Sequence, residues 1–281
     1  MHTVRYAPDT IEALCYLLAE EGANLRILGG GTHLATQLRN EKKRPHGLIW
    51  LGDIEEARGI RIVTEDCVEI GATVTMAELS TAAALSGTFG ALSQAARTVG
   101  SEQIRGMVTL GGNIAGAFYG ADTLPPLFLF DAEVQVVGPG GIGWRPVDTI
   151  LPGGQGLTAQ EALLSVRLLR RGGEWRSVFY KLGSRQTATM AQLSLAVAFR
   201  LKGETIKETR AFLGALGPQP LEVPDVKKAL NGRSPDENAA QILGGVLERF
   251  IKNAAAESPA CAYKAWAAKA VAVDAMAKIE M

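Results

Sequence analysis

The sequence predicts an α+β fold, because its hydrophobic pattern changes twice along the 281 residues. Residues 4–50 alternate between short apolar strands and helices, an order that implies parallel strand pairing. From about residue 59 apolar and polar residues alternate, as they do in antiparallel hairpins. Beyond Pro224 the chain is rich in alanine, and Pro235–Asn253 and Pro259–Ile279 have the periodicity of amphipathic helices.

These changes predict two domains. The first spans residues 1–170 and consists of a small α/β subdomain, about 1–52, and a mixed or antiparallel sheet subdomain, 53–170. The second spans 171–281 and is an α+β domain in which a small antiparallel sheet precedes helices. Its strands are expected at RSVFYKLG, LSLAVAFRL and ETRAFLGAL, which are apolar runs with β-branched and aromatic residues.

Individual elements have recognisable local signals. Asp9 or Thr10 can cap a first helix that runs through Glu20 and ends at Gly22. Thr75 and Glu78 have the spacing of a capping box, which predicts a helix through Leu85. The other elements expected before residue 170 are a hairpin around Thr64–Asp66, helices over Ala91–Thr98 and just after Asp122 with Pro125 and Pro126 in its first turn, and strands at AEVQVV and ALLSVRLL.

Composition excludes several classes of function. The 29 basic and 29 acidic residues balance and only 6% of residues are aromatic, so we expect no nucleic-acid partner. The three cysteines are far apart and form no C-x-x-C pair, so neither a disulfide framework nor a metal site is predicted. No apolar run is long enough for a transmembrane segment, and the N-terminus lacks a signal-peptide core. We expect a cytoplasmic protein.

The stretch LRILGGGTHL, residues 25–34, joins a short apolar strand to three consecutive glycines. Glycine accepts positive φ and leaves no Cβ in the way, so successive backbone N–H groups can form an anion-binding nest. The Thr32 hydroxyl adds a donor. The dinucleotide pattern G-x-G-x-x-G and the P-loop pattern are both absent. A phosphate site and a plain tight turn are therefore about equally supported by this stretch alone.

A second stretch, TLGGNIAG at Thr109–Gly116, repeats these features after the apolar Met107 and Val108. A single stretch of this kind would favour a glycine bend between a helix and a strand. Two Gly-Gly loops with flanking threonines, each after an apolar run, favour a diphosphate held from both sides by backbone N–H groups.

Few other residues suggest chemistry. Asp122 is either a helix N-cap or a partner for a ligand hydroxyl. Lys181 and His33 have the default interpretations of a strand-end charge and a loop residue. No nucleophile, acid–base pair or metal-ligand spacing is visible, so no catalytic or metal-binding residue is predicted. If the protein is an enzyme, a cofactor is expected to carry its chemistry.

These motifs resemble the FAD-binding subunits of the molybdenum hydroxylases, the family of the xanthine dehydrogenase and carbon monoxide dehydrogenase flavoprotein subunits. LGGGTHLATQLR is similar to the family's first flavin loop. QIRGMVTLGGNIAGAFYGADTLPPL is similar to its second, usually Q-I-R-N-x-x-T-I-G-G-N-I followed by Ala-Asp-x-x-P. EALLSVRLL, YKLGSR, LGALGPQP and ALNG follow in the family's order, so the resemblance covers nearly the whole chain.

The resemblance implies a two-loop FAD-binding fold and a set of residues around FAD. The first loop would wrap the diphosphate from one side and the second from the other. Asp122 would bond ribityl or ribose hydroxyls, Leu164 would lie by the adenine or flavin edge, and Lys181 would lie near the isoalloxazine, where its charge would favour the anionic reduced ring. The implied cofactor-binding residues are Leu28, Gly29, Gly30, Gly31, Thr32, His33, Leu34, Thr109, Leu110, Gly111, Gly112, Asn113, Asp122, Leu164 and Lys181.

The chain departs from the family pattern at two places. His33 stands where Asp or Ser is frequent, and Gly116–Tyr119 stands where Asn-Ala-Ser-Pro is common. Phe118 and Tyr119 could stack on or shield the flavin ring and so change the electron acceptor, or they could be filler. The cysteine-rich insertion for an extra iron–sulfur cluster, found in one branch of the family, is absent.

The function implied is that of a FAD-dependent electron-transfer subunit. Its expected partners are a molybdopterin-containing large subunit and a small subunit with [2Fe–2S] clusters. Electrons would pass from the clusters through FAD to NAD, a quinone or another small-molecule acceptor. Two alternatives remain at this point: a stand-alone FAD-dependent oxidase or reductase, and a non-catalytic flavin-free paralogue or assembly partner.

Overall fold

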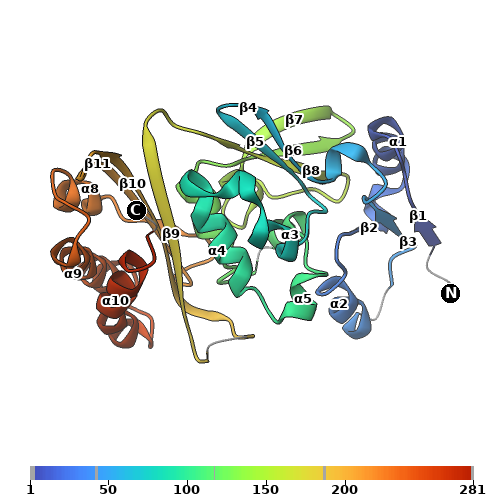
Figure 1. Cartoon of the computed structure of the whole chain (residues 1–281). Coiled ribbons are helices and arrows are strands. Elements are labelled where there is room, and N and C mark those ends of the chain that lie inside the picture. The colour runs from blue at the N-terminus through green and yellow to red at the C-terminus, as the bar shows by residue number, and fades with distance from the viewer. Residues whose placement is uncertain (1–3, 42–43, 117, 186–187, 280–281) are drawn as a thin grey trace. The chain divides into compact units, whose positions relative to one another are not determined.

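The computed structural model describes residues 4–41, 44–116, 118–185 and 188–279. Figure 1 shows its helices and strands, coloured from the N-terminus to the C-terminus. Its contacts divide the chain into two compact units, each built from three segments. Unit 1 comprises Met1–Leu79, Ser101–Ala117 and Asp131–Leu169, and unit 2 comprises Ser80–Gly100, Phe118–Phe130 and Arg170–Met281. The domain boundary near residue 170 stays a prediction. None of the helices described is both long and apolar enough to span a bilayer.

Unit 1 begins with the small α/β arrangement that the sequence predicts. Its three strands pair in parallel in the order β1-β3-β2, because helices return the chain to the same edge between strands. The Thr10 hydroxyl caps the first helix by accepting the Ala13 N–H, and Leu14 and Leu18 bury its apolar face. The elements are β1 (Val4–Tyr6), α1 (Ile11–Glu21), β2 (Leu25–Leu28), α2 (Leu34–Asn40) and β3 (Gly47–Trp50).

The second part of unit 1 is a five-stranded antiparallel sheet with the strand order β4-β5-β8-β6-β7. The expected hairpin is confirmed, since β4 and β5 pair across residues 65 and 66. The edge strand β7 was not predicted from the sequence. The strands are β4 (Ile60–Thr64), β5 (Cys67–Gly71), β6 (Glu133–Gly138), β7 (Gly141–Pro146) and β8 (Ala162–Leu169).

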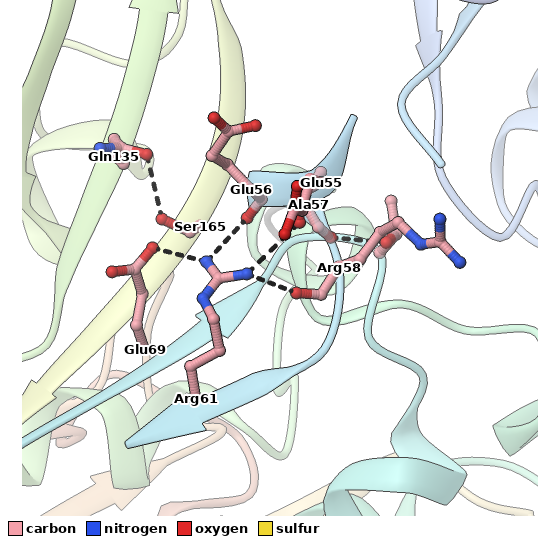
Figure 2. A network of polar contacts seen from close by, with 9 residues as sticks. Glu55, Glu56, Ala57, Arg58, Arg61, Glu69, Gln135 and Ser165 are labelled. Atoms are coloured by element: carbon pink, nitrogen blue, oxygen red, sulfur yellow. Dashed lines mark hydrogen bonds and ion pairs between the residues drawn. The ribbon is translucent and has the colours of Figure 1, made fainter. Parts of the chain in front are cut away.

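A row of alternating charges crosses this sheet, with Arg61, Glu69, Arg167 and Glu133 directly opposite one another on successive strands. The Arg61 guanidinium donates to the Glu69 carboxylate at 2.9 Å and to the backbone carbonyls of Glu55, Glu56 and Arg58 (Figure 2). These bonds hold the short turn 55–57 against the sheet. The Ala57 carbonyl in turn accepts the Thr73 N–H, which fixes the segment 72–75 that contacts the second glycine stretch.

Three short helices complete unit 1 and the start of unit 2. The capping box is confirmed: the Glu78 carboxylate accepts the Thr75 N–H at 2.7 Å, and the Thr75 hydroxyl accepts the Glu78 N–H. This helix ends at Thr81 rather than at Leu85, because the backbone of Ala82 is extended. The helices are α3 (Met76–Thr81), α5 (Glu102–Arg105) and α6 (Leu110–Ala115).

Unit 2 is built on a four-stranded antiparallel sheet in the order β12-β11-β10-β9, as expected for the C-terminal part. The two predicted Ala-rich helices are confirmed as α9 and α10, and α8 is a further short helix. The elements are β9 (Glu174–Gly183), β10 (Ala191–Lys202), β11 (Thr205–Gly214), β12 (Leu221–Glu222), α8 (Asp225–Leu230), α9 (Glu237–Ala254) and α10 (Cys261–Met276).

Strand β9 separates two layers of unit 2, because its side chains alternate between its faces. Val178 belongs to the apolar core that α9 and α10 cover. On the other face, the Ser177 hydroxyl accepts the Ala91 N–H at 3.0 Å and the Phe179 N–H donates to Gln94. These bonds fasten α4 (Gly90–Thr98) to the strand. The helix α7 (Leu124–Leu129) packs on β10 and β11, with Pro125 against Gly214.

Candidate functional site

The first glycine stretch forms an open turn between β2 and α2 in unit 1. Gly31 has a φ of +70°, which favours glycine, and α2 begins only at Leu34. In the described part of the chain, no hydrogen bond uses the backbone N–H groups of Gly29, Gly30, Gly31 or Thr32. The turn is half-buried. Four consecutive backbone donors therefore remain available at the carboxyl end of a parallel strand, which is the arrangement of an anion nest.

The two glycine stretches lie directly against each other within unit 1. A Cβ added to Gly30 would overlap the carbonyl oxygen of Met107. A Cβ added to Gly29 would lie 2.6 Å from the hydroxyl oxygen of Thr109. Both distances are shorter than real Cβ contacts, so only glycine permits this approach. The predicted juxtaposition of the two stretches is therefore present in the structure.

The second stretch is a helix start rather than the open loop that the sequence suggested. Thr109 is the N-cap of α6, and its hydroxyl accepts the Gly112 N–H at 3.2 Å. The N–H groups of Leu110, Gly111 and Asn113 donate to the carbonyls of Val74, Ala72 and Thr109 respectively. The expectation that these backbone N–H groups close on a diphosphate is wrong for this conformation, because each already has a protein acceptor.

The second stretch supplies a closely packed surface with polar side chains. Thr109 and Asn113 are buried, with exposed fractions of 5% and 7%. A Cβ on Gly111 would lie 2.6 Å from the Ala72 Cβ, so the helix must approach the segment 72–75 without a side chain there. The glycines of this stretch thus serve packing, whereas those of the first stretch leave backbone donors available.

Unit 2 contains a buried ion pair between two of the predicted residues. The Lys181 ammonium, on β9, donates to Asp122 Oδ2 at 2.6 Å, and both side chains are less than 10% exposed. The Lys181 ammonium also donates to the carbonyl of Thr98 at 3.1 Å. The Thr98 hydroxyl lies 3.1 Å from the same Asp122 oxygen. Thr98, at the end of α4, is therefore the common partner of both charged groups.

Asp122 has one oxygen that the protein does not satisfy. Its Oδ1 atom is buried and has no hydrogen-bond partner among the described residues. Burial raises the pKa of the Asp122 carboxyl, and Lys181 and Thr98 offset this increase only in part. A buried carboxylate oxygen without a donor is costly, so a donor from outside the chain, such as a ligand hydroxyl, would be stabilising here.

Of the two interpretations of Asp122, the helix N-cap is wrong. Thr123 occupies the cap position of α7, and Asp122 pairs with Lys181 instead. Lys181 is likewise a buried partner and not a solvated strand-end charge. Because the pair is close to neutral, the positive field expected from Lys181 is largely cancelled by Asp122.

The remaining predicted residues have mixed positions. Leu28, His33 and Leu34 flank the first glycine turn and are half-buried. The Leu164 side chain is fully buried in the apolar core of unit 1, and its carbonyl accepts the Ala72 N–H. Its placement beside the cofactor stays a prediction. Thr98 was not found from the sequence, because a threonine at a helix end has no local signal that it will meet residues 24 and 83 positions away.

The family comparison covers nearly the whole chain. Residues 2–168 match the family described as the FAD binding domain in molybdopterin dehydrogenase. Residues 178–279 match the CO dehydrogenase flavoprotein C-terminal domain. The fold and the site thus define a FAD-binding oxidoreductase subunit. The chain belongs to the family of FAD-binding subunits of the molybdenum hydroxylases, which includes the flavoprotein subunits of xanthine and carbon monoxide dehydrogenases.

Individual proteins similar to this chain support the same family assignment. The chain is 26% identical to the xanthine dehydrogenase FAD-binding subunit of Escherichia coli O157:H7 over 207 residues, 73% of this chain and 71% of the relative. It is 27% identical to the carbon monoxide dehydrogenase medium chain of Hydrogenophaga pseudoflava over 240 residues, 84% and 82% of the two chains. A solved carbon monoxide dehydrogenase structure from Hydrogenophaga pseudoflava matches with a TM-score of 0.82 at 24% identity, covering 99% of this chain and 96% of that one, which shows the shared fold.

Proposed function

We propose that this chain passes electrons through FAD within a molybdenum hydroxylase complex. Its partners would be a large subunit that carries molybdopterin and a small subunit that carries [2Fe–2S] clusters. Electrons would enter from the clusters and leave to NAD, a quinone or another small-molecule acceptor. The names of the relatives, which include a medium chain and FAD-binding subunits, support a role as one subunit among several.

The observation that carries this proposal is the open turn Gly29–Thr32. A diphosphate carries negative charge on oxygens that accept hydrogen bonds, and four adjacent backbone N–H groups without protein acceptors match that need. The close approach of Gly30 to Met107 holds the turn against the segment that precedes α6, so the donors are preorganised before the ligand arrives. The Thr109 and Asn113 side chains would contribute from the neighbouring helix start.

The Asp122–Lys181 pair would bind a polar part of the cofactor. Asp122 Oδ1 can accept a hydrogen bond from a hydroxyl group, as a ribityl or ribose group would offer. Lys181 uses two of its three protons on Asp122 and Thr98, which leaves one for a cofactor acceptor. When bound, FAD supplies redox chemistry that can exchange electrons with both one-electron and two-electron partners. The protein residues described here bind and orient it.

The proposal is tested by affinity purification of the tagged chain from its native cell, with cofactor analysis of the co-purified proteins. Recovery of molybdopterin and [2Fe–2S] subunits with about one FAD per chain supports the proposal. Oxidation of a small organic donor by the isolated chain would instead identify a stand-alone flavoenzyme. Failure of the folded chain to take up FAD in a titration would identify a non-catalytic relative.

A further inference from the structure

Two side chains far apart in the sequence share one acceptor in unit 2. The Tyr119 hydroxyl donates to the carbonyl oxygen of Ala215 at 3.0 Å. The Lys264 ammonium, on α10, donates to the same oxygen at 2.6 Å. The three residues are separated by 96 and 49 positions. We call this set, Tyr119, Ala215 and Lys264, the Ala215 node.

The acceptor of the node has an unusual backbone conformation. Ala215 follows β11 directly and has a φ of +62°, in the left-handed region that a residue with a Cβ rarely adopts. Its side chain is buried, with an exposed fraction of 2%. Such a conformation costs free energy and persists only where neighbouring contacts fix it. The two hydrogen bonds to its carbonyl are contacts of this kind.

Lys264 is not explained by the packing of α10. The residue is 8% exposed, and none of the ion pairs among the described residues includes it. Burial lowers the pKa of its amino group, as expected for a cation removed from water without a counter-charge. An apolar side chain of similar length would fill the same place at lower cost. The ammonium is therefore retained for what it binds, which is the Ala215 carbonyl.

The node holds the segment that carries Asp122. Gly120 has a φ of +74°, and a Cβ there would lie 3.4 Å from the Ala215 Cβ, so residues 119 and 120 lie on Ala215. Asp122 follows two residues later, with the buried Oδ1 that lacks a partner. Two fixed points thus define the path of this short segment: Tyr119 on Ala215, and Asp122 on Lys181.

We propose that Tyr119 and Lys264 are positioning residues that set the orientation of Asp122 toward the cofactor. This inference rests on the proposed function, in which Asp122 accepts a FAD hydroxyl. It also gives a role to the departure at Gly116–Tyr119, of which residue 117 lies outside the described residues. The Tyr119 hydroxyl binds the C-terminal half of unit 2, so its ring is oriented by the node even though the residue is half exposed.

The test compares Tyr119→Phe and Lys264→Met with matched controls on α10, Tyr263→Phe and Lys269→Met, in the full-length chain. Tyr119→Phe removes only the hydroxyl. We expect each node variant to weaken FAD binding about three- to tenfold, the effect of one lost hydrogen bond transmitted to Asp122. Amide exchange at residues 120–123 should accelerate in the same variants. The controls should bind FAD like the wild type.

Stability separates a positioning role from a purely structural one. Lys264→Met removes a buried cation, so its unfolding midpoint should equal or exceed that of the wild type while its FAD affinity falls. Equal FAD affinity in wild type, Tyr119→Phe and Lys264→Met would overturn the inference. A wild-type chain that binds no FAD would instead overturn the proposed function, and unchanged amide exchange at 120–123 would then count against the node by itself.

Discussion

The ammonium of Lys181 lies 2.6 Å from Asp122 Oδ2, and this buried pair joins β9 to the segment that precedes α7. Both partners are among the residues that the family pattern places near FAD, yet in the structure they first satisfy each other. Because the Lys181 ammonium neutralises the Asp122 carboxylate, the carboxylate can be buried before any ligand is present. The pair therefore has a stability role in the free chain as well as a proposed role in binding.

Replacement of Lys181 by methionine should strongly destabilise unit 2. The variant leaves the Asp122 carboxylate buried with only the Thr98 hydroxyl near it, and loss of one partner of a buried pair typically costs about 3–5 kcal/mol. The free energy of unfolding, measured with urea at neutral pH, should fall by this amount. Asp122→Asn combined with Lys181→Met should recover a large part of the loss, because no unpaired charge remains. A double variant as unstable as the single one would contradict this account.

Thr98 is expected to affect both the stability of the Asp122–Lys181 pair and the pKa of Asp122. Thr98→Val keeps the side-chain shape but removes the hydroxyl 3.1 Å from Asp122 Oδ2, so about 1 kcal/mol of stability should be lost. The pKa of Asp122 should rise further, because the Thr98 hydroxyl lowers it. Thr98→Ser should behave like the wild type. Ser93→Ala, which removes another hydroxyl from α4 that bonds the Ser80 carbonyl instead, is the control for a general effect on the helix.

The sequence could predict whatever depends on nearby residues. Apolar periodicity indicated the parallel and antiparallel strands, and the spacing of Thr75 and Glu78 indicated their reciprocal bonds. The α6 helix was missed because two consecutive glycines disfavour a helix. Its carbonyl acceptors come from residues 72 and 74, which local patterns cannot place. The Asp122–Lys181 pair spans 59 positions, and neither the residue pattern nor the family resemblance indicated that the two side chains pair.

The helix pair α9–α10 should show a defined acid sensitivity. Glu248 accepts hydrogen bonds from Lys252 at 2.8 Å and forms an ion pair with Lys269 at 2.9 Å, which lower its pKa to about 2. Because the folded protein favours the ionised Glu248 carboxylate, this group stabilises the fold at pH values above its ordinary pKa of 4.5. The stabilisation is lost as the pH falls toward 2. The stability difference between wild type and Glu248→Gln should be largest at neutral pH and vanish below about pH 2. Urea unfolding of both proteins across this range gives the measurement, and a difference that does not depend on pH would assign Glu248 a packing role.

Substitution of Gly30 by alanine should weaken FAD binding at the open turn Gly29–Thr32 much more than it destabilises the fold. The new Cβ would overlap the Met107 carbonyl oxygen, which is backbone and cannot rotate away, so the turn must move away from Met107. We expect a stability loss of about 1–3 kcal/mol, as for other overpacked sites, and a loss of FAD binding of at least about a hundredfold, because the four backbone donors lose their alignment.

Gly59→Ala is the control: Gly59 has a φ of +67° with open space around it, so its cost is backbone strain of about 1 kcal/mol without any effect on the turn. Fluorescence titration with FAD and urea unfolding of both variants give the comparison. If Gly30→Ala binds FAD as tightly as Gly59→Ala, the open amides of this turn do not hold the diphosphate.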